Sequence, residues 1–134
     1  MLYAMLAYHD ERHVQSWTED ADADLMGQLQ AIHVRQDAAG QLGPAARLGA
    51  TAKAVTIRAK GLVVDGPFAE TKEALLGLYV LDVADMDAAI EQARAIQAVN
   101  PSAIYEIRPI VFYRPGKAIP LSDFGLADVR AEGI

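Results

Sequence analysis

The chain contains no cysteine, which excludes disulfide bonds, thiolate nucleophiles and cysteine-based metal sites. This composition suits a reducing compartment, so we expect a cytoplasmic protein. No apolar run approaches the roughly 20 residues needed to cross a bilayer. The first residues also lack the basic segment and cleavage site of a signal peptide. The sequence therefore indicates no membrane partner.

Basic residues are few, with 12 Lys and Arg against 18 Asp and Glu and a net charge of −6. Such a balance argues against nucleic acid as a partner, because phosphates require a basic face. The sequence also has no phosphate-binding loop and no dinucleotide fingerprint, so we expect no cofactor. The run from His9 to His13 lacks a third ligand at metal-binding spacing, and we expect no metal.

What the chain does contain is 134 residues of ordinary globular composition, 52% hydrophobic, which is enough for one domain. A helix is expected over 21–39, and a second one between its cap Asp85 and the breaker Asn100-Pro101. Apolar runs and turn residues predict strands at 2–8, 46–50, 54–58, 62–65, 75–83 and 103–113.

This order of elements predicts an α+β, ferredoxin-like βαββαβ fold with both helices on one face of an antiparallel sheet. In strand 75–83, Leu78 and Val80 point to one face while Tyr79 and Leu81 point to the other. Both faces of the sheet are therefore apolar, and two helices can cover only one of them. We expect the chain to form a homodimer with itself through the open sheet faces.

The most specific pattern is Asp65-Gly66-Pro67-Phe68, between an apolar run and a short charged segment. With the other matching segments it resembles the DGPF branch of the YCII-related family, over roughly residues 1–114. The resemblance implies a dimeric α/β barrel and a function that is largely unassigned. The other matching segments are residues 1–8, a helix that carries His33, residues 81–89 and residues 105–110.

Residues 115–134 have no counterpart in the family core. Pro115-Gly116 breaks the last strand, yet apolar residues such as Phe124 and Leu126 follow. We expect this extension to dock on the domain with a short helix that runs to about Ala131, and fraying of the terminus is the alternative.

His33 is the first candidate catalytic residue. It stands four residues after Leu29, within the apolar stripe of the first helix, where a polar imidazole needs a partner. The resemblance implies that a histidine and an aspartate act as a dyad, here His33 as base and Asp65 as the group that orients it. Two alternatives stay open: a core histidine bonded to a backbone carbonyl, and an aspartate that only forms the turn before Gly66.

The candidate substrate-binding residues are less specific. Arg108 on the last strand and Lys72 could contact an anion, and either could equally form surface ion pairs. Phe68 could close a pocket mouth. Glu70 could supply a second carboxylate, although a solvated turn explains it as well. His9 ends the first strand, at a sheet edge where ligands often bind.

These residues leave three functions open. The first is a small cofactor-free enzyme that performs proton transfer, isomerisation or elimination on a small molecule, carboxylated or lactone-like. The second is a non-catalytic module that binds a small ligand or regulates, which the resemblance links to alternative sigma factor signalling. The third is a structural interaction protein. The sequence does not decide whether the chain is an enzyme.

Overall fold

The computed structural model describes residues 1–117. Its elements follow the predicted order, with additions in the first and middle parts of the chain. They are β1 (Leu2–Asp10), α1 (Glu11–Gln15), α2 (Glu19–Ala38), β2 (Leu42–Arg47), β3 (Val55–Ile57), β4 (Val63–Asp65), β5 (Glu73–Asp82), α3 (Met86–Val99) and β6 (Ile104–Pro109), with 3-10 turns at Thr51–Lys53 and Ala59–Gly61.

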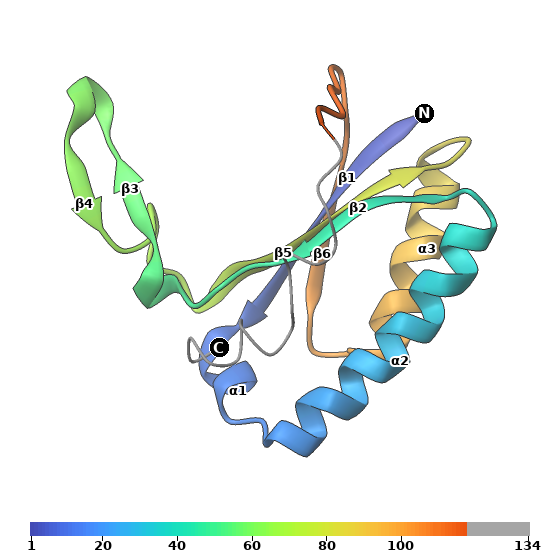
Figure 1. Ribbon diagram of the computed structural model, residues 1–134, viewed down its shortest axis with the longest axis horizontal. Coiled ribbons are helices and arrows are strands. Elements are labelled where there is room, and N and C mark those ends of the chain that lie inside the picture. The colour runs from blue at the N-terminus through green and yellow to red at the C-terminus, as the bar shows by residue number, and fades with distance from the viewer. Residues whose placement is uncertain (118–134) are drawn as a thin grey trace.

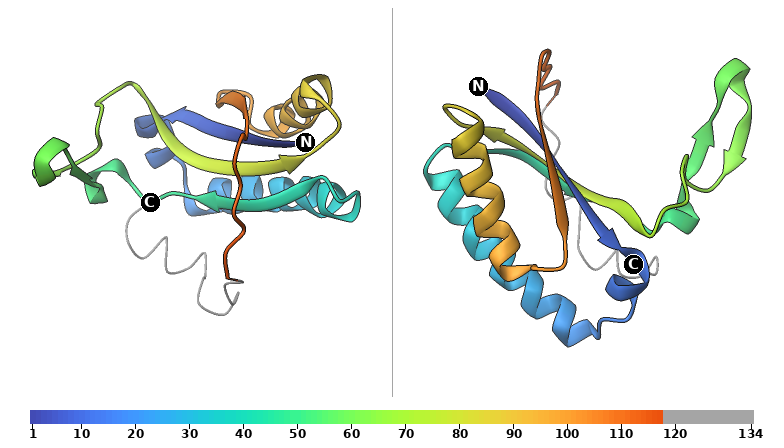
Figure 2. Two further views of the ribbon diagram at one scale, coloured as in Figure 1. Left: turned by 90° about the horizontal axis from the view of Figure 1, so that it is seen from above. Right: turned by 180° about the vertical axis from the view of Figure 1, so that it is seen from behind.

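Four strands form an antiparallel sheet in the order β2-β5-β1-β6. Helices α2 and α3 lie side by side on one face of this sheet (Figure 1, and from behind in Figure 2). The predicted α+β, ferredoxin-like fold is confirmed. Within residues 1–117, no helix has the length and apolar character that a membrane span requires.

The core lies between the helices and the sheet. Tyr3 and Met5 of β1 and Leu81 of β5 point toward the helices, where Ile32 of α2 and Ile96 of α3 meet them, and all five are buried. Tyr3 pairs with Leu81 in the antiparallel register, so the alternating side chains of both strands fall on the same face. The hydrophobic stripes seen in the sequence therefore form the core.

The opposite face of the sheet, which no helix of residues 1–117 covers, carries the alternate side chains of β1 and β5. Leu6 pairs with Leu78 and Ala4 with Val80, and all four are half-buried in the single chain. The two apolar faces expected for strand 75–83 are present in β5, whereas β6 adds Glu106 and Arg108 to this face. The homodimer through this face stays a prediction, because a single chain is described.

The first half of the chain departs from the sequence prediction in several places. Helix α2 begins two residues early, because Thr18 caps it by accepting a hydrogen bond from the Ala21 backbone N–H at 3.0 Å. The short helix α1 was not expected; Asp10 caps it through the Arg12 N–H at 3.0 Å. Strand β2 lies at 42–47 rather than 46–50, because it pairs with Gly77 to Leu81 of β5.

The second half of the chain follows the predictions closely. Asp85 caps α3 by accepting from the Ala88 N–H at 2.9 Å, and Asn100 ends the helix as expected. The last strand stops at Pro109, earlier than the predicted end at 113, because β6 pairs with β1 only as far as Tyr3. The predicted helix of the extension lies outside the described residues.

Strands β3 and β4 form a hairpin that projects from the domain; with its flanking turns we call residues 51–66 the arm (Figure 1). Glu11 of α1 holds its base, accepting from the Thr51 N–H at 2.9 Å and the Thr51 hydroxyl at 2.6 Å. Gly66 leaves the arm at φ 101, a conformation that favours glycine, and its N–H donates to the Ala54 carbonyl at 2.7 Å. The arm therefore leaves the domain in a fixed direction.

Candidate active site

A cavity of about 340 Å³ lies between the sheet and the first two helices. This volume is within the range of small-molecule sites. Its floor is made of small residues of the central strands, and its walls carry the larger and polar groups. The larger and polar wall residues include His9, Trp17, His33, Arg47, Tyr79 and Tyr105.

His33 of α2 lies in the wall of this cavity and is half-buried. Its Nε2 atom is buried and has no hydrogen-bond partner among the described residues. Burial alone lowers the pKa of His33 below its ordinary value, so the neutral imidazole is the dominant form at neutral pH. A buried imidazole nitrogen without a partner is costly in a core but suited to a ligand.

Tyr79 of β5 faces the His33 ring edge to face, with the ring centroids 5.3 Å apart. Burial, together with the neighbouring Tyr105, raises the pKa of Tyr79 to about 12. Burial also raises the pKa of Tyr105, while a hydrogen bond with the Asn100 side chain opposes that shift. Both phenols therefore stay protonated at neutral pH and can donate hydrogen bonds.

His9 is a second imidazole in the cavity wall, and unlike His33 it is hydrogen-bonded. Its Nδ1 lies 3.2 Å from the Asp10 carbonyl, which can only accept, so the proton is on Nδ1. Nε2 then accepts from the Ser102 hydroxyl at 2.8 Å. Burial lowers the pKa of His9, and the bond to the Asp10 carbonyl opposes this. The ring also stacks on His13, with centroids 5.2 Å apart, so it is held firmly in place.

Among the residues described, Arg47 at the end of β2 is the Lys or Arg side chain that lines the cavity. Its Nη1 lies 3.0 Å from an Asp22 carboxylate oxygen of α2, and both side chains are largely buried. The guanidinium has five N–H donors, and the contacts with Asp22 run through Nη1. Arg47 can therefore hold Asp22 and still present donors toward an anion in the cavity.

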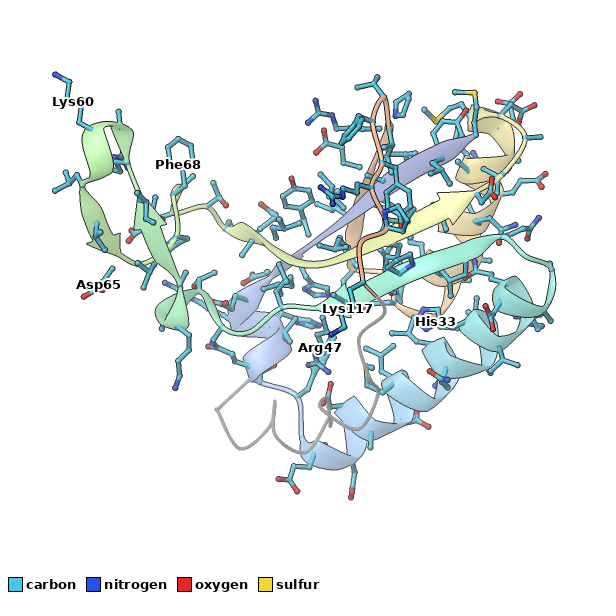
Figure 3. All side chains as sticks on the ribbon, turned by 45° about the horizontal axis from the view of Figure 1, so that its top comes forward. His33, Arg47, Lys60, Asp65, Phe68 and Lys117 are labelled. Carbon is cyan, nitrogen blue, oxygen red and sulfur yellow. The ribbon has the colours of Figure 1, made fainter. Side chains whose placement is uncertain are left out.

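Of the residues expected to form the site, the structure brings His33 and His9 to this cavity and leaves the others elsewhere. Asp65 is exposed on the arm, on the other side of the molecule from His33 (Figure 3). Within one chain the two residues do not form a dyad. Phe68 is 76% exposed, with the Arg58 guanidinium 5.4 Å from its ring centroid, so it does not close the cavity of its own chain.

The remaining candidates also lie apart. Lys72 is exposed in the segment that leads from the arm to β5, and Arg108 is exposed on the open face of the sheet. Glu70 lines a smaller pocket of about 270 Å³ beside the base of the arm, where Glu11 and Thr51 also lie. None of the three lines the larger cavity as residues 1–117 form it.

Several cavity residues escaped the sequence argument. Tyr79 was assigned to an apolar strand face, and nothing in the sequence marks it as the neighbour of His33. Arg47 was not among the candidate site residues, and no local pattern in the sequence marks it as the neighbour of Asp22. Ser102 follows the helix breaker, and its bond to His9 spans 93 residues. The position of Asn100-Pro101 just before a strand indicates a loop near the sheet edge, and this was the one signal for Ser102.

The fold and this site together define a class: a small ferredoxin-like α+β domain with a cavity lined by histidine and tyrosine between sheet and helix. The chain belongs to the YCII-related domain family, whose model matches residues 1–114. It is also 46% identical over 121 residues to an uncharacterized protein of Rhizobium meliloti (strain 1021), a match that covers 87% of this chain and 98% of that protein.

Proposed function

We propose that the chain is a cofactor-free acid–base enzyme that acts on a small carboxylated or lactone-like molecule in the cavity beside His33. The observation that carries this proposal is the position of His33 in the wall of a cavity of small-molecule size, with a buried Nε2 that has no partner among the described residues. A neutral imidazole in such a position can accept a proton from a bound molecule.

The reaction that fits is a proton shift. The proton leaves a substrate carbon for the imidazole of His33, and the electron pair moves into the adjacent carbonyl, whose oxygen becomes an enolate. The Tyr79 hydroxyl, protonated because its pKa is about 12, can donate to that oxygen. Return of the proton to the same or a conjugated carbon completes an exchange or an isomerisation without a co-reactant.

Binding and orientation of the substrate fall to the cavity walls. Arg47 supplies donors for a carboxylate, and its ion pair with Asp22 fixes the guanidinium plane. Trp17 and the apolar parts of α2 surround the rest of the molecule. Arg47 replaces Arg108 and Lys72 as the anion contact in this proposal, because only Arg47 lines the cavity.

A second function, ligand binding without turnover, is favoured by one observation. Histidine bases are usually oriented by a third group, and burial is the sole cause of the lowered His33 pKa, with no carboxylate contributing. A ligand could therefore be held by His33, Tyr79 and Arg47 without reaction.

Deuterium exchange separates the two functions. The protein is incubated in D2O with a panel of 2-oxo acids, β,γ-unsaturated acids and small lactones, and NMR follows the loss of carbon-bound protons. Exchange should fall by about a hundredfold or more in His33→Gln. It should persist in Arg35→Gln, an exposed change on the same helix.

The outcomes decide the proposal. A compound that shifts the Met26 and Tyr79 signals but does not exchange makes the cavity a binding site. Exchange that survives His33→Gln removes His33 as the base. A panel that leaves all cavity signals unmoved refutes small acids and lactones as the ligand class.

A further inference from the structure

The arm exposes apolar side chains that its own chain does not cover. Val55 and Ile57 of β3 and Val63 of β4 lie on one face of the hairpin, since Ile57 pairs with Val63 and Val55 with Asp65. Ile57 is 73% exposed and the other two about as much, at 60% and 61%. An isolated two-stranded hairpin is marginally stable in water, so this apolar face needs a cover.

The charges around the arm are basic, in contrast to the acidic chain. Lys53, Arg58 and Lys60 are exposed on it, with Lys60 at its tip (Figure 3). The corner formed by α1 and the start of α2, residues 11–25, has the opposite character. Along it, half-buried Val14 and Trp17 are followed by exposed Glu19, Asp20 and Asp24, and Arg12 is its one basic side chain apart from His13. One surface is apolar with a basic border, and the other is apolar with an acidic border.

We propose that the arm of one chain packs on the α1–α2 corner of a second copy. The base of each arm is held by Glu11 of its own corner. A two-fold rotation that brings two corners together therefore lets each arm reach the other corner, and the contact closes as a reciprocal pair. The partner is a second copy because the same chain carries both complementary surfaces.

This contact makes the cavity a site shared between two chains. Val14 and Trp17 of the corner also line the cavity, so the arm of the second copy borders its mouth. Asp65 lies on the same face of the arm as Val55, and the exchange carries this carboxylate toward the cavity of the other copy. The contact depends only on the two surfaces, and it forms whether or not the cavity is catalytic.

Charge exchange between the two surfaces tests the contact directly. One variant carries Lys53→Glu and Lys60→Glu in the arm, and the other carries Asp20→Lys and Asp24→Lys in the corner. Each alone places like charges together and should weaken self-association by tenfold or more in sedimentation. A mixture of the two variants should pair normally, because both contacts in the mixed dimer are again of opposite charge.

Cross-linking locates the contact. Because the chain has no cysteine, Lys60→Cys gives a single attachment point for a benzophenone maleimide at the arm tip. After mixing isotope-labelled and unlabelled chains, cross-links should join the two kinds of chain within residues 11–25. The control, Asp87→Cys on α3, should give none there. Circular dichroism of every variant should match the parent, since all the changed side chains are exposed.

Three results would overturn the proposal. The protein could be a monomer at every concentration tested, or each charge variant could associate as the parent does, so that mixing changes nothing. The third is that the arm tip cross-links within one chain or to the open sheet face of the other.

Discussion

Replacing His33 by leucine should stabilise the protein while abolishing any function of the cavity. The buried Nε2, which has no partner among residues 1–117, costs about 1–3 kcal/mol. The leucine forfeits the edge contact of the imidazole with Tyr79, about 0.5–1.5 kcal/mol. Leucine also favours the helix by a few tenths of a kcal/mol. The net gain in unfolding free energy is about 1 kcal/mol, or roughly 4 °C in melting temperature.

The gain in unfolding free energy from His33→Leu should grow as the pH falls. The pKa of His33 is lowered in the folded chain, so near pH 6.5 and below the unfolded chain binds the proton first. The wild type therefore loses stability as the pH falls from about 6.5 toward the folded pKa, and the leucine variant does not share this loss. His9 also has a lowered pKa, but its effect on stability is the same in the wild type and in the leucine variant. It therefore cancels in the difference between their unfolding free energies.

Urea unfolding near neutral pH and at about pH 5.5, followed by the fluorescence of Trp17, the single tryptophan, measures both effects. His33→Gln, which keeps a polar group, should gain less. Val34→Leu, a change at the exposed position next to His33 that involves no titrating group, should keep the pH dependence of the parent. A leucine variant less stable than the parent at both pH values, with the same pH slope, would refute the account of His33 as a buried group without a partner.

Two further changes test the supports of the site and the fold. Arg47→Met should lower the unfolding free energy by about 2–3 kcal/mol, because it leaves the buried Asp22 carboxylate without its guanidinium; a urea midpoint equal to the parent's would contradict this role of the ion pair. Asp85→Ala should cost about 1 kcal/mol through loss of the α3 cap. Asp85→Ser, which can still cap the helix, should recover most of that loss in the same measurement, and equal losses in both variants would argue against capping.

The fold could be predicted from the sequence because its elements carry strong periodic signals. Side chains that alternate between two faces around Leu78 and Leu81 are typical of a strand. The helical spacing of buried residues from Leu29 to Gln36 is typical of a helix. Helix α1 escaped because five residues are too few to show a stripe. Strand β2 was displaced because its Gly43 and Pro44 are turn signals, and only pairing with β5 makes that segment a strand.

A site residue could be predicted only where it differs in polarity from the pattern of residues around it. His33 was found because it is a polar residue in an apolar stripe. Its expected partner Asp65 was assigned from the family resemblance and its place at a strand end, but neither states the direction in which a hairpin leaves the sheet. The pairing of Arg47 with Asp22 depends on how α2 crosses β2, which no local pattern encodes.

The position of the cavity follows from the sizes of the side chains that face the helices. At one end of the sheet, β1 and β5 present Tyr3, Met5 and Leu81, which fill the space under α3 and the end of α2. At the other end the same strands present Ala7 and Gly77, which pair with each other. A Cβ on Gly77 would lie 3.2 Å from the Ala46 carbonyl oxygen, so even alanine would crowd this point. The strands therefore cannot fill the space below His33, and the hollow end of the sheet is a consequence of the chain's own small residues.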